Sequence, residues 1–113
     1  MLCFPELAIT GYPPEDLLLN NKFIESTDSM IKQLIKLSKG INCIVGYPKK
    51  IEDKLFNVAG IFANGKLQGE YKKFQLPNYG VFDENRYFEK GVETETFKIK
   101  NQVVGISICE DIW

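Results

Sequence analysis

Residues 41–48, "INCIVGYP", form a continuous apolar run with β-branched residues, bounded by Gly40 and Pro48. Such a run is typical of a strand that is buried on both faces of a sheet. Shortly after it, "LFNVAGIFA" (55–63) and "KLQGEYKK" (66–73) flank Asn64–Gly65, the pair favoured in a tight type I′ turn. Residues 55–72 are therefore predicted to form a hairpin.

The segment before this sheet predicts a helix and one more strand. From Asn21 to Lys39 apolar residues recur at helical spacing, and Gly40 is placed as the stop. The apolar positions are Phe23, Ile24, Met30, Ile31, Leu34 and Ile35. Residues 1–4 are interpreted as the end of a buried strand, and residues 6–19 as a loop with a short helix near Pro14. We expect the long helix to cover the sheet.

The segment after the hairpin predicts a second antiparallel pair. "TFKIK" (96–100) and "VVGISIC" (103–109) flank Asn101–Gln102, which places Cys109 at the end of a strand. The order of elements is strand, helix, strand, hairpin, loop, hairpin. This order predicts a mixed α/β fold in a single domain.

Composition narrows the class of protein. The chain has 113 residues, is 44% hydrophobic and 26% charged, and carries a formal net charge of −1. Lys49, Lys50 and Lys54 stand beside Glu52 and Asp53, so they predict a solvated loop and not a nucleic-acid surface. No apolar run approaches the ~20 residues that a bilayer requires. We expect a cytoplasmic protein that binds neither nucleic acid nor membrane.

The cysteines and the lack of histidine limit the available chemistry. Three widely spaced cysteines, with no histidine, indicate neither a disulfide framework nor a zinc site. Cys3 and Cys43 are interpreted as core residues. If Cys109 is a nucleophile, its base must be a carboxylate or a lysine, because the usual histidine base is missing.

Glu6 and Lys73 are the candidates for that role. Glu6 follows the first strand, where a strand end presents a carboxylate to a cleft, and Lys73 lies just beyond a strand, where an ammonium could stabilise an oxyanion. Each residue also has a simpler interpretation. Cys109 fits a packed core thiol, Glu6 a solvated residue or a cap, and Lys73 the rim of a hairpin.

Three longer segments together resemble the nitrilase (carbon–nitrogen hydrolase) superfamily. "FPELAITGYPPEDLLL" (4–19) is similar to its glutamate loop, "YKKFQLPNYGVFDENRYFEKG" (71–91) to its lysine segment, and "VVGISICEDIW" (103–113) to its nucleophile strand. The order Glu, Lys, Cys is the family's order. The wording "TGYPPEDLL", "LPNYGVFDE" and "CEDIW" most resembles the glutaminase domains of glutamine-dependent NAD synthetases.

The resemblance implies specific roles. It makes Cys109 the nucleophile, Glu6 the general base and Lys73 the group that stabilises the tetrahedral intermediate. Glu84 matches a second glutamate that orients the lysine and the substrate. Tyr12, Tyr79 and Phe82 match positions that line the glutamine pocket, although simple loop packing also accounts for them. The backbone N–H of Glu110 would contribute to an oxyanion hole.

The resemblance also implies an incomplete domain. The fold would be part of a four-layer αββα sandwich with a mixed sheet, truncated at both ends, so that residues 1–113 form a partial carbon–nitrogen hydrolase domain. A synthetase domain, to which ATP would belong, is absent from these residues, and we expect neither metal nor cofactor in them. We expect the isolated chain to be poorly stable and inactive, and to associate with itself or with a complementing polypeptide. The alternatives are another amidase of the superfamily and a noncatalytic remnant.

Overall fold

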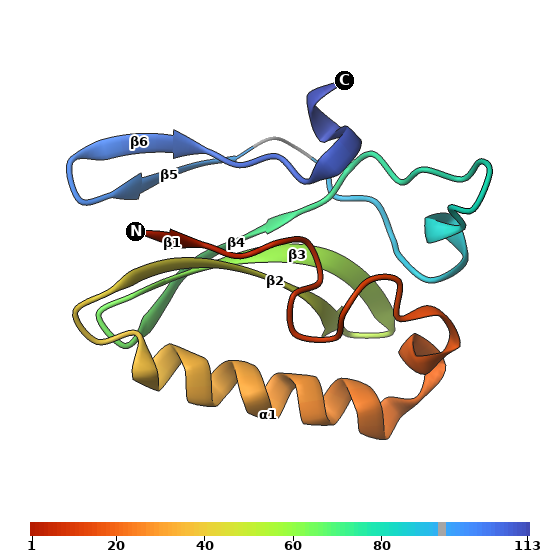
Figure 1. Cartoon of the computed structure of the whole chain (residues 1–113), viewed down its shortest axis with the longest axis horizontal. Helices are drawn as coiled ribbons and strands as arrows, with labels where there is room; N and C mark the ends of the chain where they lie inside the picture. The colour runs from red at the N-terminus through yellow and green to blue at the C-terminus, as the bar shows by residue number, and fades with distance from the viewer. Residues whose placement is uncertain (93–94) are drawn as a thin grey trace.

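A four-stranded mixed sheet in the order β1–β2–β3–β4 forms the centre of the structure (Figure 1). The computed structural model describes residues 1–92 and 95–113. The strands of the sheet are β1 (Leu2–Cys3), β2 (Asn42–Ile51), β3 (Lys54–Ala63) and β4 (Lys66–Lys72), and a separate hairpin joins β5 (Thr96–Ile99) to β6 (Gln102–Gly105). The helices are α1 (Asn21–Leu37) and the short 3-10 helices η1 (Glu15–Leu19), η2 (Glu84–Arg86) and η3 (Cys109–Ile112).

The sheet confirms the predicted strand and hairpin. β2, β3 and β4 form an antiparallel meander, and β1 pairs in parallel with β2. Asn64 and Gly65 both have positive φ, +53° and +74°, as a type I′ turn requires. β2 is longer than predicted, since it continues past Pro48 to Ile51. Proline is tolerated there because β1 pairs only as far as Ile44, so β2 has no strand partner on that side at Pro48.

The sheet is covered on both faces (Figure 1). α1 packs against one face through a core of Ile31, Val45, Tyr47, Val58 and Phe62. The β5–β6 hairpin lies over the other face, where the core contains Ile44, Ala59, Ile61, Tyr71, Ile99 and Ile108. Adjacent residues of β2 thus enter opposite cores, which confirms the predicted burial on both faces. The described residues form three layers, helix, sheet and hairpin, of the mixed α/β architecture.

α1 lies where its sequence pattern predicts it. The Asn20 side chain caps its start by accepting hydrogen bonds from the backbone N–H groups of Lys22 and Phe23 at 3.0 and 3.4 Å. The buried residues Ile24 and Ile31 lie on the face toward the sheet. After the helix ends, Gly40 has a φ of +76°, a conformation that glycine adopts without strain.

The C-terminal part differs from the prediction in two ways. The tight turn lies at residues 100–101, because Ile99 pairs with Gln102. β6 ends at Gly105, so Cys109 does not end a strand. Cys109 instead begins η3, with a φ of +51°. After Gly105 the backbone leaves the β5–β6 pair and turns toward the end of β4, where side-chain hydrogen bonds replace strand pairing.

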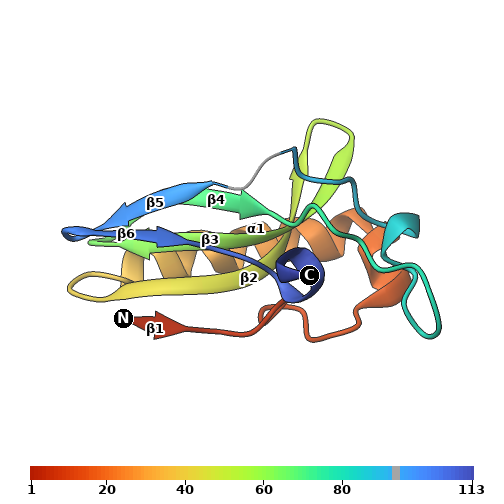
Figure 2. The same ribbon diagram turned by 90° about the horizontal axis from the view of Figure 1, so that it is seen from above.

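The surface shows where apolar groups remain exposed. Figure 2 shows β1 along one edge of the sheet. The exposed apolar side chains there and around η3 are Met1, Leu2, Phe4, Ile112 and Trp113. Cys3 is exposed and Cys43 is partly buried, so the prediction of a core position is wrong for Cys3. The reason is that β1 is an edge strand with exposed residues, so the interpretation of residues 1–4 as the end of a buried strand is wrong as well. No helix in the described part of the chain is long and apolar enough to cross a bilayer.

Candidate active site

Glu6 is placed by a close crossing between its loop and β2. The Phe4 N–H donates to the Ile44 carbonyl at 2.9 Å, after which the chain turns across Gly46. A Cβ at Gly46 would lie 2.5 Å from both the Pro5 oxygen and the Leu7 nitrogen, and 2.9 Å from the Cα of Glu6. Only glycine therefore allows the backbone around Glu6 to lie directly on the strand.

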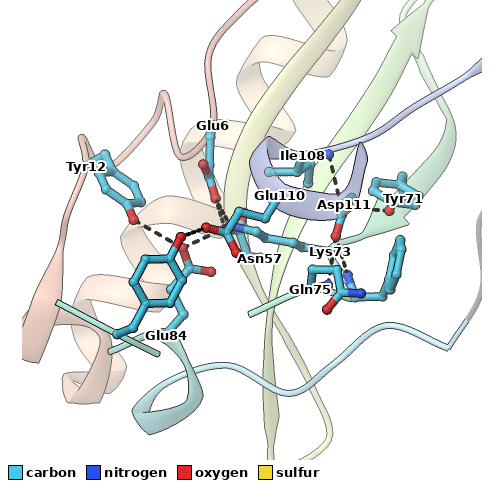
Figure 3. Close-up of polar contacts among 12 residues, drawn as sticks. Glu6, Tyr12, Asn57, Tyr71, Lys73, Gln75, Glu84, Ile108, Glu110 and Asp111 are labelled. Carbon is cyan, nitrogen blue, oxygen red and sulfur yellow. Dashed lines mark hydrogen bonds and ion pairs between the residues drawn. The ribbon is translucent and has the colours of Figure 1, made fainter. Parts of the chain in front are cut away.

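Lys73 lies at the centre of the site and bridges two carboxylates (Figure 3). It follows β4, and its side chain is completely buried. Its Nζ donates to Oε1 of Glu6 at 2.7 Å and to Oε1 of Glu84 at 2.9 Å. One ammonium therefore faces two carboxylates, and the cluster carries a net negative charge when all three groups are ionised.

The surroundings shift the pKa values of this cluster. Burial acts to lower the pKa of Lys73, but the hydrogen bonds and charges of Glu6 and Glu84 outweigh it, so that the pKa is raised. Burial raises the pKa of Glu84, and Lys73 opposes this shift. The Tyr12 pKa is also raised, by burial first and then by Glu84, Glu6 and Cys109. Lys73 thus stays a cation, and Tyr12 stays protonated.

Glu84 and Tyr12 complete the network from two separate loops. Glu84 begins η2, where its backbone N–H donates to the Pro77 carbonyl at 3.2 Å. The Tyr12 hydroxyl donates to the same Glu84 oxygen that Lys73 contacts, at 3.1 Å. The sequence-predicted residues Glu6, Tyr12, Lys73 and Glu84 therefore lie together, although they span residues 6 to 84 of the chain.

Asn57 is a member of the network that the sequence analysis missed. Its side chain is fully buried in β3, and its Nδ2 donates to Oε1 of Glu6 at 2.7 Å. Its backbone carbonyl accepts from the Lys73 N–H at 2.9 Å. The available signal was a polar amide inside the apolar run "LFNVAGIFA", since a buried amide needs hydrogen-bond partners.

Cys109 lies near Glu6 in an exposed turn. Both residues line a cavity of about 290 Å³, together with Cys3 and Ile108. The positive φ of Cys109 is uncommon for a residue other than glycine, and such conformations concentrate at functional sites. The simpler prediction of a packed core thiol is therefore wrong, because Cys109 is exposed.

The remaining predicted residues lie beside this turn and beside Glu84. The Tyr79 hydroxyl hydrogen-bonds to the Glu110 carboxylate, and the rings of Tyr79 and Phe82 meet edge to face with centroids 5.7 Å apart. Phe82, Tyr12 and Glu84 also line a second cavity of about 610 Å³. The Glu6–Lys73–Glu84 network thus connects the cavity beside Cys109 to a larger cavity with aromatic walls.

The sequence analysis also missed Asp111, a residue of η3 whose side chain lies toward the end of β4 in Figure 3. Its carboxylate accepts hydrogen bonds from the backbone N–H of Phe74, just after β4, and from that of Ile108, just before η3. The sequence signal was its position two residues after Cys109. Within residues 1–92 and 95–113, no group of three or more His, Cys, Asp or Glu side chains is arranged to hold a metal ion.

Comparison with known proteins gives one consistent family. The family model described as carbon-nitrogen hydrolase matches residues 1–113. Glutamine-dependent NAD(+) synthetases from Xylella fastidiosa and Thermotoga maritima are each 43% identical over 115 aligned residues, which cover 100% of this chain. The chain spans only about a fifth of their length, 21% and 20% respectively.

Solved structures agree with these relatives. The glutamine-dependent NAD+ synthetase of Acinetobacter baumannii, in complex with ADP, superposes with a TM-score of 0.91 at 39% identity, over 99% of this chain and 22% of that one. An amidase from Nesterenkonia sp. AN1 superposes with a TM-score of 0.78 at 20% identity, over 98% of this chain and 44% of that one. The second likeness shows a shared fold.

Proposed function

The chain belongs to the carbon–nitrogen hydrolase family, and we propose that it hydrolyses the side-chain amide of glutamine as the ammonia-supplying part of a glutamine-dependent NAD synthetase. The observation that carries the proposal is the fully buried Lys73, which contacts both Glu6 and Glu84 while Glu6 shares a cavity with Cys109. An acid, an amine and a thiol in one place are the groups that amide hydrolysis through a thioester requires.

In the proposed reaction, Glu6 acts as the base. Both Asn57 and Lys73 contact its Oε1, which leaves Oε2 to accept the thiol proton. The sulfur of Cys109 then attacks the amide carbon, and the tetrahedral intermediate collapses to a thioester as Glu6 returns the proton to the departing ammonia. Water, deprotonated by Glu6, hydrolyses the thioester to glutamate and regenerates the thiol.

Lys73 supplies the electrostatic part of this proposal. Its raised pKa keeps it charged at neutral pH, and its burial strengthens its effect on nearby negative charge. It hydrogen-bonds to Glu6 in the resting state and stabilises the oxyanion during attack. Glu84 fixes the ammonium from the other side, and the backbone N–H of Glu110 is proposed as an oxyanion donor.

The proposed glutamine pocket lies beside the Cys109 turn. Tyr12 and Phe82 bring aromatic surface close to Glu84, and the Tyr79–Glu110 pair stands next to the nucleophile. The two carboxylates and two tyrosine hydroxyl groups there suit a substrate with an amide and an ammonium group. Since the relatives are about five times as long, we propose that ATP-dependent NAD synthesis resides outside residues 1–113.

The test uses the complete polypeptide that contains this segment. A glutamine-like chloroketone should label Cys109, as located by mass spectrometry, and ammonia should be released faster from glutamine than from aliphatic amides. Cys43→Ser, at a partly buried thiol that lines neither of the two cavities, should leave both results unchanged, whereas Cys109→Ser should abolish both. A folded protein that is not labelled at Cys109 would favour a noncatalytic remnant, and a preference for aliphatic amides would favour another amidase of the superfamily.

A further inference from the structure

The carboxylate of Asp111 joins the segment that contains Cys109 to the segment that contains Lys73 (Figure 3). Its Oδ1 accepts from the backbone N–H groups of Phe74 at 3.1 Å and Gln75 at 2.7 Å. Its Oδ2 accepts from the Tyr71 hydroxyl at 2.7 Å and from the backbone N–H of Ile108 at 3.0 Å. All four partners are donors, and three of them are backbone groups.

Three of these partners lie directly beside the proposed catalytic residues in the sequence, or one residue further along. Phe74 and Gln75 directly follow Lys73, and Ile108 directly precedes Cys109. Strand pairing does not connect the two segments, because β4 ends at Lys72 and β6 ends at Gly105. Hydrogen bonds to an ionised acceptor are shorter and stronger than neutral ones, so one carboxylate can hold both segments at a fixed separation.

The conformation of Cys109 makes such a restraint necessary. Its φ of +51° is disfavoured for a residue with a side chain, and its turn is exposed. A residue keeps such a conformation only when the surrounding contacts determine it. The bond from the Ile108 N–H to Asp111 fixes the Ser107–Ile108 peptide, one residue before Cys109, and the bonds from Phe74 and Gln75 fix the two peptides that follow Lys73.

We propose that Asp111 is a positioning residue that sets the distance and direction of the Cys109 thiol relative to Glu6 and Lys73. The inference rests on the proposed function, since it assigns to Asp111 the task of aligning that reaction. Asp111 acts through the backbone of Ile108 and does not itself exchange a proton with the substrate. A displacement of the reacting atoms by about 1 Å can cost on the order of 100-fold in rate.

The variant Asp111→Asn separates this role from general stability. The asparagine oxygen can still accept from Phe74 and Gln75, and its amide can donate to Tyr71, whose hydroxyl can also accept. The same amide meets the Ile108 N–H donor to donor, so this one contact is lost. Tyr71→Phe is the matched variant, because it removes a different bond to the same carboxylate oxygen and leaves the Ile108 bond intact.

The experiment compares these variants in the complete polypeptide, with Asp53→Asn in the exposed β2–β3 turn as a further control. For Asp111→Asn we expect kcat for glutamine hydrolysis to fall by about 10- to 100-fold with KM changed less than threefold. The iodoacetamide alkylation rate of Cys109, measured relative to Cys3 in the same sample, should fall at least about fivefold, because the thiol moves away from Glu6 and Lys73. Tyr71→Phe and Asp53→Asn should change each quantity less than about threefold.

Two results would overturn the proposal. One is an Asp111→Asn protein with kcat and Cys109 alkylation within twofold of the wild type. The other is a loss of activity no larger than the loss of folded protein, measured by thermal unfolding. If the wild type does not hydrolyse glutamine, the proposed function fails by itself. The alkylation ratio then decides the positioning role alone, with a fall in Asp111→Asn supporting it and an unchanged ratio rejecting it.

Discussion

Replacing Lys73 with methionine should strongly destabilise the domain, because it leaves two carboxylates facing each other without a cation. Methionine matches the length of the buried stem, so packing changes little. The Glu84 side chain is 7% exposed, and it would keep only the Tyr12 hydroxyl as a donor to its Oε1. Glu6 is 18% exposed and keeps the amide of Asn57, so most of the cost falls on Glu84.

The size of the effect follows from the burial of the pair. Removing one partner of a buried ion pair costs about 3–5 kcal/mol, since the remaining charge stays in a poorly solvated place. Protonation of Glu84, whose pKa is already raised by burial, would relieve part of this cost. We therefore expect about 3 kcal/mol near neutral pH. For a domain of 150–250 residues this lowers the unfolding temperature by roughly 6–12 °C.

The assay is calorimetric unfolding of the complete polypeptide, with the double variant Lys73→Met/Glu84→Gln as the decisive comparison. A neutral amide at residue 84 removes the unpaired negative charge, so the double variant should recover about half of the stability that Lys73→Met loses. The exposed Lys32→Met on α1 should change the unfolding temperature by only about 1 °C. A cost below about 1 kcal/mol for Lys73→Met, or additive effects in the double variant, would refute the assignment of a tightly coupled buried pair.

Three further predictions test the same cluster. Glu6→Gln should keep the fold but lower kcat for glutamine hydrolysis by about 10²- to 10⁴-fold in an ammonia-release assay, whereas the exposed Glu25→Gln should not. Gly46→Ala should destabilise the domain by about 1–3 kcal/mol in urea unfolding and reduce kcat, because the new Cβ would displace the backbone at Glu6. A Cβ at Gly105 meets nothing within 4 Å, so Gly105→Ala should leave the stability unchanged. Because its folded pKa is raised above its ordinary value of 10.5, the charged Lys73 contributes stability that is fully present below that pH and is lost above it. The difference in unfolding temperature between the wild type and Lys73→Met should therefore shrink in a calorimetric series that crosses pH 10.5, and a constant difference would contradict this.

Local signals predicted the regular elements well. The Asn64–Gly65 turn and the end of α1 before Gly40 depend on backbone conformations that the residues themselves favour. The errors arose where distant contacts decide the backbone. The sequence pattern predicts a strand boundary at Pro48, but proline is tolerated within β2 because β1 is so short. The pattern also predicts a strand up to Cys109, but the segment after Gly105 bends away from β5 and is held by Asp111.

The site could be predicted only in part. Spacing alone left Glu6 and Lys73 as weak candidates, since their contact joins residues that are 67 positions apart. The family resemblance identified the positions that the structure brings together. Asn57 and Asp111 were not predicted, because their roles depend on the three-dimensional positions of their hydrogen-bond partners. An amide in an apolar strand and a carboxylate near the C-terminus acquire a role only when the fold aligns their partners.

The topology explains how such distant residues converge. β1 and β4 lie at opposite edges of the sheet, but both run parallel to β2, so their C-terminal ends reach the same end of the sheet. Glu6 follows β1 and Lys73 follows β4, and the two central strands between them close the gap. β2 supplies Gly46, whose missing side chain lets the Glu6 loop cross it, and β3 supplies Asn57, which binds Glu6 by its side chain and Lys73 by its carbonyl. All four strands therefore contribute to one ionic contact, and a change in pairing anywhere in the sheet would separate the carboxylate from the ammonium.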